Sequence, residues 1–449
     1  MNERQQVSGS YGGRNASPAY AYYVVGCLML ASAFSFLDRL VLSLLIDPIR
    51  KSMGLTDSEV SLLAGLAFAS CYVLFAFAFG RWVDARSRKR AIVLGITLWS
   101  LATALCGAAR GYWQLFAARM GVGVGEASLN PAAYSIIPDY FPPRRRGLAM
   151  SIYACGASIG GGLAILAGGL VVQWALARQP GLPLIGAVEP WQFVFAVGLP
   201  GLLVALLIWL TVREPARSLT AIDSAEPPPM REVTRFVGDH RRAFLPIFLG
   251  YGAIAMNGYA FQLWGPAFFM RLHDLTPAQV GLIFGIGYGV GGTVAILLGG
   301  VVSDALVRRG RSDGPILVTI AAVVLALPTF LLAYLTTDTT LAVVGFAGGI
   351  FAASLVGGVQ AAMVQSLAPN RMRGLLAALF GATVNVAGLG IAPTMTAGLS
   401  DYVFGGPLGI GKALAATTII TMIVAIALLL VGLRHARALA GTLNQGSDV

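Results

Sequence analysis

Twelve apolar stretches, each long enough to cross a lipid bilayer, are the feature that most constrains the fold of this chain. About 20 apolar residues span the hydrocarbon core as a helix, and a helix satisfies its own backbone polar groups there. Hydrophobic residues make up 57% of the 449 residues, and charged residues only 11%. We therefore expect an all-α membrane protein of twelve transmembrane helices. The expected spans are residues 20–46, 58–80, 91–108, 112–137, 147–174, 191–212, 243–270, 277–303, 314–335, 339–366, 374–400 and 408–433.

The basic residues predict the orientation of these spans. Most of the 31 Lys and Arg residues lie in the two tails and in the even-numbered loops, and cytoplasmic loops are the ones enriched in Lys and Arg. We expect both termini in the cytoplasm and a multi-pass protein of the inner (plasma) membrane. The same distribution accounts for the formal charge of +11 without a nucleic-acid partner.

A polar linker divides the spans into six plus six. The longest internal polar stretch covers residues 213–242 and contains three consecutive prolines at 227–229, a composition typical of a mobile linker. We expect two six-helix bundles on either side of it. The expected parts are a cytoplasmic tail at 1–19, an N-terminal bundle at 20–212, the cytoplasmic linker at 213–242, a C-terminal bundle at 243–433 and a cytoplasmic tail at 434–449.

A turn of the pattern G-x-x-x-D-A-x-x-basic-basic follows both the second and the eighth span. Its members are Gly80, Asp84 and Arg88 in the first copy and Gly300, Asp304 and Arg308 in the second. Glycine permits close helix approach, and an Asp at a helix end can pair with Arg or accept from a neighbouring helix N-terminus. We expect a cytoplasmic conformational latch that holds in one conformation and releases in the other. A capping Asp in a basic loop explains one copy equally well, but not the duplication.

Four ionisable side chains lie well inside the spans, all in the N-terminal bundle: Asp38, Arg39, Arg119 and Glu126. A charge at this depth costs several kcal/mol and usually marks a functional site. At 1.5 Å per residue, the first three lie roughly 7 to 9 Å on the outer side of the midplane, and Glu126 lies near it. We expect a switchable site here.

Depth and helix phase suggest a role for each of these groups. Asp38 can meet Arg119 if spans one and four are neighbours, as a gate or only as a structural pair. Arg39 points about 100° away from Asp38 and is the expected anchor for an anionic headgroup. No histidine lies deep in a span, so proton coupling falls to Glu126 and Asp38, and we favour the deeper Glu126. Asn130 continues the face of Arg119 and Glu126 toward the cytoplasm. Structural ion pairs that lock the two spans together are the alternative.

The repeated turn resembles that of the major facilitator superfamily, whose second-to-third loop carries G-x-x-x-D-(R/K)-x-G-(R/K)-(R/K). Ala85 and Ser87 depart from this pattern, whereas the arrangement of spans resembles the superfamily over the whole chain. The resemblance implies a secondary transporter of two bundles that works by alternating access around a central cavity. We expect a monomer that is not an enzyme and holds no cofactor or metal.

Three motifs are similar to those of the spinster family of lipid transporters: Phe36-Leu-Asp38-Arg39, Gly123-Val-Gly-Glu126-Ala127, and Asp139-Tyr-Phe-Pro142 before Arg146-Gly147. Spinster proteins are linked to lysophospholipids and sphingosine 1-phosphate. By this resemblance Asp38, Arg39, Arg119 and Glu126 bind the headgroup and couple protons. The anion:cation symporters of the same superfamily carry a similar Asp-Arg and Glu-Ala, so a small organic anion such as a sugar acid is the alternative substrate.

The C-terminal spans offer polar side chains but no charge at the expected cavity. We expect its substrate-binding residues to be Asn257, Trp264, Gln360 and Asn385. A charged half opposite an uncharged half suits an amphipathic anion, with its headgroup toward the first bundle and its tail toward the second. Ordinary helix packing explains each of these residues equally well when taken alone.

Overall fold

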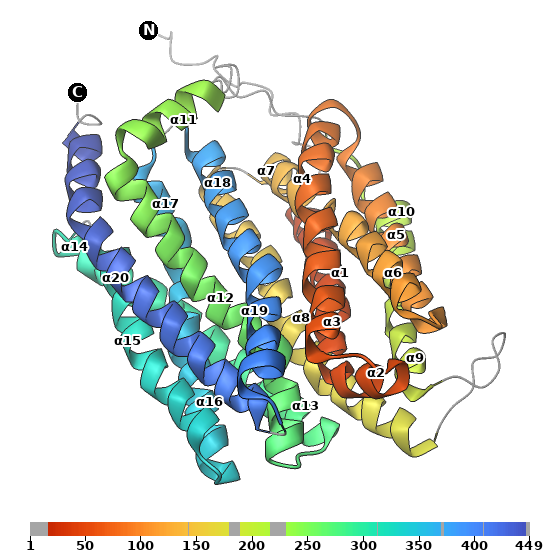
Figure 1. Cartoon of the computed structure of the whole chain (residues 1–449). Coiled ribbons are helices and arrows are strands. Elements are labelled where there is room, and N and C mark those ends of the chain that lie inside the picture. The colour runs from red at the N-terminus through yellow and green to blue at the C-terminus, as the bar shows by residue number, and fades with distance from the viewer. Residues whose placement is uncertain are drawn as a thin grey trace, which may run out of the picture.

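The structure, a computed structural model, describes residues 17–141, 143–178, 189–215, 230–311, 313–369, 372–406 and 408–445. All regular elements among these residues are helices. We call residues 17–215 the N-terminal half and residues 230–445 the C-terminal half. Figure 1 shows the halves next to one another, the first in red to yellow-green and the second in green to blue.

Each half consists of long helices joined by short ones. The N-terminal half contains α1 (Pro18–Leu44), α2 (Ile46–Met53), α3 (Asp57–Ser61), η1 (Leu62–Leu66), α4 (Ala67–Ala85), α5 (Arg88–Ala108), α6 (Tyr112–Glu126), α7 (Leu129–Tyr140), α8 (Pro143–Arg178), α9 (Pro190–Val194), η2 (Phe195–Gly198) and α10 (Pro200–Thr211). The C-terminal half contains α11 (Met230–Asp239), α12 (Arg241–Leu272), α13 (Pro277–Ile286), η3 (Gly287–Gly292), α14 (Thr293–Arg308), α15 (Gly314–Leu335), α16 (Thr339–Ser354), η4 (Leu355–Gly358), α17 (Gln360–Leu367), α18 (Arg373–Asn385), η6 (Val386–Ile391), α19 (Ala392–Gly398), η7 (Leu399–Phe404) and α20 (Gly409–Gln445).

Eleven helices among the described residues are long and apolar enough to cross a membrane. The fourth expected span is not one of them, because it is divided into α6 and α7. Pro131 lies in the first turn of α7 and has no backbone N–H to donate to residue 127, and Ser128 hydrogen-bonds through its hydroxyl to the Gly125 carbonyl (2.9 Å). The count of twelve spans therefore stays a prediction.

The internal repeat also appears in the way equivalent helices begin. Thr56 caps α3 in a reciprocal capping box with Glu59, and Thr276 caps α13 in the same way with Gln279. Both caps open the segment that leads to the repeated turn, at the start of the second and the eighth span. Such a cap satisfies two of the backbone N–H groups that a helix start leaves without partners.

Glycines let helices of the two halves approach closely. A Cβ on Gly169 of α8 would lie 2.3 Å from the carbonyl oxygen of Pro277, and one on Gly281 of α13 would lie 2.7 Å from that of Ile165. Gly65 in η1 is equally close to the other half, at 2.8 Å from the Leu389 carbonyl oxygen. Larger side chains at these positions would force the halves apart.

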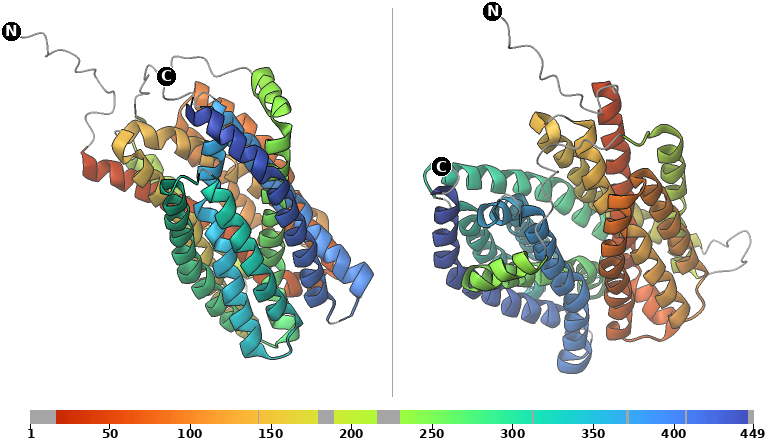
Figure 2. Two further views of the ribbon diagram at one scale, coloured as in Figure 1. Left: turned by 90° about the vertical axis from the view of Figure 1, so that its left-hand side faces the viewer. Right: turned by 90° about the horizontal axis from the view of Figure 1, so that it is seen from above.

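Ionic contacts join the halves at the end of the bundle opposite to the end where α20 terminates. We call these the opposite end and the terminal end; Figures 1 and 2 show α11 across the terminal end. Arg271 of α12 pairs with Asp47 (Nη2 to Oδ1, 2.7 Å) and with Asp57 (Nη1 to Oδ2, 2.7 Å) of the N-terminal half. Asp401 accepts from the backbone N–H and the hydroxyl of Ser58, both at 2.7 Å. These contacts seal the opposite end.

We predict that Arg271→Gln opens the opposite end. Removing one partner of a buried ion pair destabilises the conformation that contains it by about 3 to 5 kcal/mol. Only the conformation that is sealed at the opposite end contains this pair, so only its free energy rises. Spin labels at Ser52 and Tyr402, two exposed positions in different halves, report the separation in a background without the four native cysteines. The expected result is a population at longer distance. Lys51→Gln, which removes an exposed charge from α2 that forms no ion pair with described residues, is the control. An unchanged distance distribution for Arg271→Gln contradicts the assignment.

Candidate functional site

Asp38 and Arg39 of α1 lie close to Arg119 and Glu126 of α6 inside the N-terminal half. Asp38, Arg119 and Glu126 are each only 1% exposed. Glu126 is the last residue of α6, at the break that Pro131 imposes. All four groups are therefore held on helices in the interior of one half, as the sequence predicts.

Arg39 and Glu126 form a buried ion pair. The Arg39 Nε lies 2.5 Å from the Glu126 Oε2, and the same oxygen accepts from the Ser35 hydroxyl at 2.6 Å. The Glu126 side chain is fully buried, whereas the Arg39 side chain is 15% exposed. The Glu126 Oε1 has no hydrogen-bond partner among the described residues. Glu126 is thus the counter-ion of Arg39 in this conformation.

Three aromatic rings surround the Arg39 guanidinium. Its Cζ lies 5.1 Å from the ring centre of Phe36, 4.8 Å from that of Phe68 and 5.0 Å from that of Tyr72. Each cation–π contact contributes about 0.5 to 2 kcal/mol. Phe68 and Tyr72 are not among the expected site residues. Both belong to the apolar second span, and the rotation of that helix, which decides whether their rings face Arg39, cannot be read from the apolar run itself.

Arg119 and Asp38 make no direct ion pair, so the expected contact is absent in this conformation. The Asp38 Oδ2 accepts from the Thr103 hydroxyl at 3.2 Å, and Arg119 stacks against Phe68 at 5.6 Å. The Asp38 Oδ1 and the Arg119 Nε and Nη1 have no hydrogen-bond partner among the described residues. These orphaned buried atoms mark a site that another group or another conformation completes.

Asn130 extends the polar region through two tyrosines. Its Nδ2 donates to the Tyr72 hydroxyl at 3.1 Å, and its Oδ1 accepts from the Tyr153 hydroxyl at 2.6 Å. Since Tyr72 also stacks on the Arg39 guanidinium, Asn130 acts on the site through this ring and not through a hydrogen bond to Arg39.

An apolar cavity of about 350 Å³ lies in the C-terminal half and reaches the N-terminal half at Phe36. Aliphatic and aromatic side chains form most of its wall, and its polar side chains include Gln262 and Gln360. Tyr259 also lines it. Phe36, which contacts the Arg39 guanidinium, therefore joins the charged site to the apolar cavity.

The other expected C-terminal residues do not line this cavity. Asn257 is buried between α12 and α20, where its Oδ1 accepts from the Thr418 hydroxyl at 2.7 Å. Trp264 is fully buried, and its indole N–H donates to the Pro393 carbonyl at 3.1 Å. Asn385 is half-buried at the end of α18, directly before the π-helical η6. Packing accounts for the first two in this conformation.

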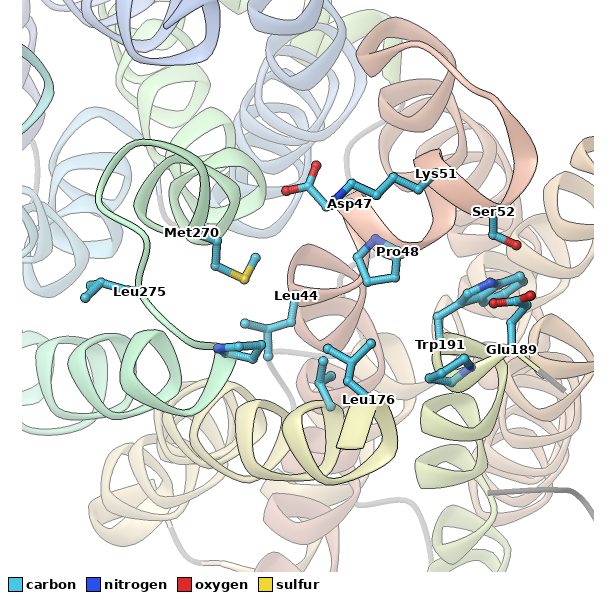
Figure 3. Close-up of a pocket in the computed structure, with 13 residues that line it drawn as sticks. Leu44, Asp47, Pro48, Lys51, Ser52, Leu176, Glu189, Trp191, Met270 and Leu275 are labelled. Carbon is cyan, nitrogen blue, oxygen red and sulfur yellow. The ribbon is translucent and has the colours of Figure 1, made fainter. Parts of the chain in front are cut away.

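A second cavity, of about 630 Å³, lies at the opposite end, where residues of both halves line it. Figure 3 shows Asp47 and Lys51 on one side of it, with Met270 and Leu275 from the C-terminal half on another. Asp38, Arg39, Arg119 and Glu126 do not line it. This cavity therefore adjoins the sealing contacts of Asp47 and is separate from the charged site.

The expected latch residues do not join the halves in this conformation. A Cβ on Gly80 would meet no atom within 4 Å, and one on Gly300 would meet a carbonyl only at 3.8 Å. Gly300 nevertheless lies close to a neighbouring helix, because a Cβ on Gly358 would lie 2.9 Å from the Gly300 nitrogen, and a Cβ on Gly299 would lie 2.2 Å from the Leu355 carbonyl oxygen. The closure of the latch in another conformation stays a prediction. The side chain of Asp84 lies outside the described residues.

Asp304 and Arg308 are exposed and make no ion pair with described residues. Arg88 is instead buried within its own half. It pairs with Asp139 and with Glu214, whose Oε1 lies 2.8 Å from the Arg88 Nε. Arg88 thus ties together the ends of α5, α7 and α10.

Glu214 links this cluster to pH. Burial by itself raises the pKa of the Glu214 carboxyl, but hydrogen bonds from the Arg88 side chain and from the Ser87–Lys89 turn outweigh burial and lower it. A carboxyl group with a folded-state pKa below its unfolded value of about 4.3 stabilises the fold above that value. The stabilisation is lost as the pH falls through the folded-state pKa.

We predict that Glu214→Gln lowers the melting temperature at pH 7. The difference from the wild type narrows below about pH 4, where the wild-type carboxyl is protonated too. Thermal unfolding in detergent at several pH values measures both effects. Glu232→Gln, at an exposed position of α11 with no ion pair among described residues, is the control. A melting-temperature difference that stays constant with pH contradicts the role of the Glu214 charge.

Comparisons with known proteins agree with this geometry. The family model of the Major Facilitator Superfamily matches residues 28–393. An MFS-type efflux pump of Mycolicibacterium smegmatis is 28% identical over 406 residues, which cover 88% of this chain and 89% of that protein. Human protein spinster homolog 1 is 29% identical over 323 residues, covering 67% of this chain and 57% of the human protein.

The fold is similar to that of a solved bacterial protein. A bacterial homolog of the human lysosomal transporter Spinster, in an inward-facing and unoccupied conformation, superposes with a TM-score of 0.78 at 26% identity. The match covers 96% of this chain and 99% of that structure. The fold, the motifs around the buried charges and these relatives agree. This chain belongs to the Major Facilitator Superfamily and is a transporter of the spinster type.

Proposed function

We propose that the protein is a proton-coupled secondary transporter for an amphipathic anion, such as a lysophospholipid or a sphingosine-phosphate-like lipid. The observation that carries this proposal is the position of Arg39. Its guanidinium is paired with Glu126 on one side and stacks on Phe36, which lines the apolar cavity, on the other. A phosphate bound to Arg39 leaves room for an acyl chain in that cavity.

Arg39 and Glu126 provide the coupling in this proposal. An anionic headgroup and the Glu126 carboxylate compete for the same guanidinium, because both offer oxygen acceptors to its fork. Protonation of Glu126 weakens its hold on Arg39 and releases it to the substrate. Proton binding therefore favours anion binding. Asp38 is the second carboxyl of the coupling site, and Arg119 supplies a further cation with unsatisfied donors.

The C-terminal half supplies the apolar surface for the tail. Its cavity wall is mainly aliphatic and aromatic and contains no charged side chain. Gln360 and Asn130 are the proposed polar contacts on either side of the charged site. A sugar acid carries hydroxyl groups along its whole carbon chain, and each needs a hydrogen bond. The apolar wall of this cavity offers few donors or acceptors for them. This favours the amphipathic anion over the small organic anion.

Alternating access follows from the contacts between the halves. The opposite end is sealed by Arg271 and Asp401, and the fold is similar to that of an inward-facing transporter. We propose that the terminal end is cytoplasmic, in agreement with the basic residues of its loops. In the outward-facing state the Arg271 contacts open and the cytoplasmic latch closes. This latch consists of Gly80, Asp84, Arg88, Gly300, Asp304 and Arg308.

The remaining features of the proposal concern the whole molecule. Two six-helix bundles at 20–212 and 243–433, joined by the linker at 213–242, form one transporter. The protein works as a monomer in the inner membrane. Asp38 and Arg119 act as a gate in the outward-facing state, where their side chains approach one another.

Transport by purified protein in liposomes tests the proposal. We predict pH-gradient-driven uptake of a labelled lysophospholipid and none of a sugar acid such as galactonate. Glu126→Gln keeps substrate binding but loses the response to the pH gradient. Arg39→Gln weakens binding at least about tenfold, since it removes a charge-assisted bidentate contact. Arg110→Gln, an exposed position outside the site, is the matched control.

Three results contradict the proposal. Uptake of galactonate without uptake of lysophospholipid would identify the substrate as a small organic anion. Unchanged pH-driven uptake by Glu126→Gln removes this residue from coupling. Equilibration of the lipid without any overshoot indicates a scramblase rather than a coupled carrier.

A further inference from the structure

A basic cavity lies at the terminal end of the C-terminal half, far in the fold from the charged site of the N-terminal half. Its volume is about 570 Å³. The turn between α11 and α12 forms one wall and the last turns of α20 form the other. Its cationic or titratable residues are His240, Arg241, Arg242 and His435, and its one acidic residue is Asp239.

The arginines of this cavity have no acidic partner among the residues that the structure describes. Arg241 and Arg242 are exposed and form no ion pair with described residues. The histidines turn Nδ1 toward backbone carbonyls of the preceding turn, Phe236 for His240 (3.0 Å) and Val431 for His435 (3.4 Å). Even with both histidines neutral, two arginines outweigh the single Asp239.

The first turn of α12 adds to the positive potential. His240 occupies the N-cap position of this helix but makes no side-chain capping hydrogen bond. The backbone N–H groups of a helix start carry a partial positive charge of about half an elementary charge. Two arginines, this helix start and the cavity thus point to an anion with several oxygen acceptors, as a phosphate offers.

The sequence places this cavity at the level of lipid headgroups. The apolar run of α12 begins at Ala243, directly after Arg242, and that of α20 ends at Leu433, two residues before His435. Helix α11 lies beside it, with Val233 buried in the C-terminal core and Arg231 and Arg235 exposed; Figure 1 shows α11 crossing this end of the bundle. Basic residues just outside an apolar run lie among the headgroups of the bilayer.

We propose that this cavity binds the phosphate of an anionic glycerophospholipid from the leaflet at the terminal end. The bound phosphate contacts Arg241 and Arg242 at the first turn of α12, and His435 of α20 lines the opposite wall. The general enrichment of basic residues on one side of a membrane protein explains the two arginines at this end, but not the cavity between α12 and α20 that they line. The site is distinct from the transport site and does not depend on which substrate is carried.

Lipid binding by the detergent-solubilised full chain tests this proposal. Native mass spectrometry with phosphatidylglycerol should show one retained lipid, and phosphatidylcholine should be retained at least about tenfold less. The double variant Arg241→Gln/Arg242→Gln should lose about tenfold in phosphatidylglycerol affinity. The double variant Arg231→Gln/Arg235→Gln removes the same charge from exposed positions of α11 and should stay within about twofold of the wild type. His435→Gln probes the other wall and should also weaken retention.

Three outcomes overturn the proposal. Equal losses in both double variants show diffuse attraction to the surface instead of a site. Equal retention of the two lipids removes the preference for an anion. Displacement of phosphatidylglycerol by millimolar inorganic phosphate makes the ligand a soluble anion. Because the readout is binding without transport, its failure leaves the proposed transport function untouched.

Discussion

The buried ion pair between Arg39 and Glu126 is the interaction on which the site depends. Isolated charges are very costly in a low-dielectric interior, and a pair is tolerated only when hydrogen bonds and close geometry compensate for lost hydration. Here Ser35 adds a hydrogen bond to the carboxylate, and aromatic rings cover the guanidinium. One Glu126 oxygen nevertheless lacks a hydrogen-bond partner among the residues that the structure describes. A pair that is stable but incompletely satisfied is suited to exchanging partners during a transport cycle.

The two halves divide the chemistry of an amphipathic molecule between them. The N-terminal half holds Asp38, Arg39, Arg119 and Glu126, and none of the described residues that line the cavity of the C-terminal half is charged. Phe36 belongs to both, because it contacts Arg39 and lines the cavity. Contacts that differ between the two ends of the bundle then decide which side reaches this site. The Arg271 ion pairs close one end, whereas at the other end a Cβ on Gly80 would meet no atom of the described residues within 4 Å.

The sequence predicts the parts of the fold that depend on local hydrophobicity. Eleven of the expected spans correspond to helices long enough to cross a membrane, because an apolar run of that length has few other stable structures. The division of the fourth span follows from Pro131, a local signal that the hydropathy count ignored. The repeated start of spans two and eight was visible in the same way, since Thr56 and Thr276 each precede a side chain that completes a capping box.

Partner choice in the site depends on helix rotation and on contacts between distant segments, which no local pattern reports. The sequence placed Asp38 near Arg119 by depth, but Thr103 holds Asp38 and Glu126 holds Arg39. The pairing of Arg271 with Asp47 and Asp57 joins residues more than 200 positions apart, so sequence reasoning did not find it. Asn257 and Trp264 are expected at the cavity, but in this conformation their side chains hydrogen-bond to Thr418 and Pro393 within the C-terminal half.

An experimental structure with a bound lysophospholipid tests the central claim most directly. The account predicts elongated density with the phosphate at the Arg39 guanidinium and the acyl chain along the cavity lined by Phe36, Tyr259 and Gln262. Density confined to a small polar site in the N-terminal half, with the apolar cavity left without ligand, would contradict it.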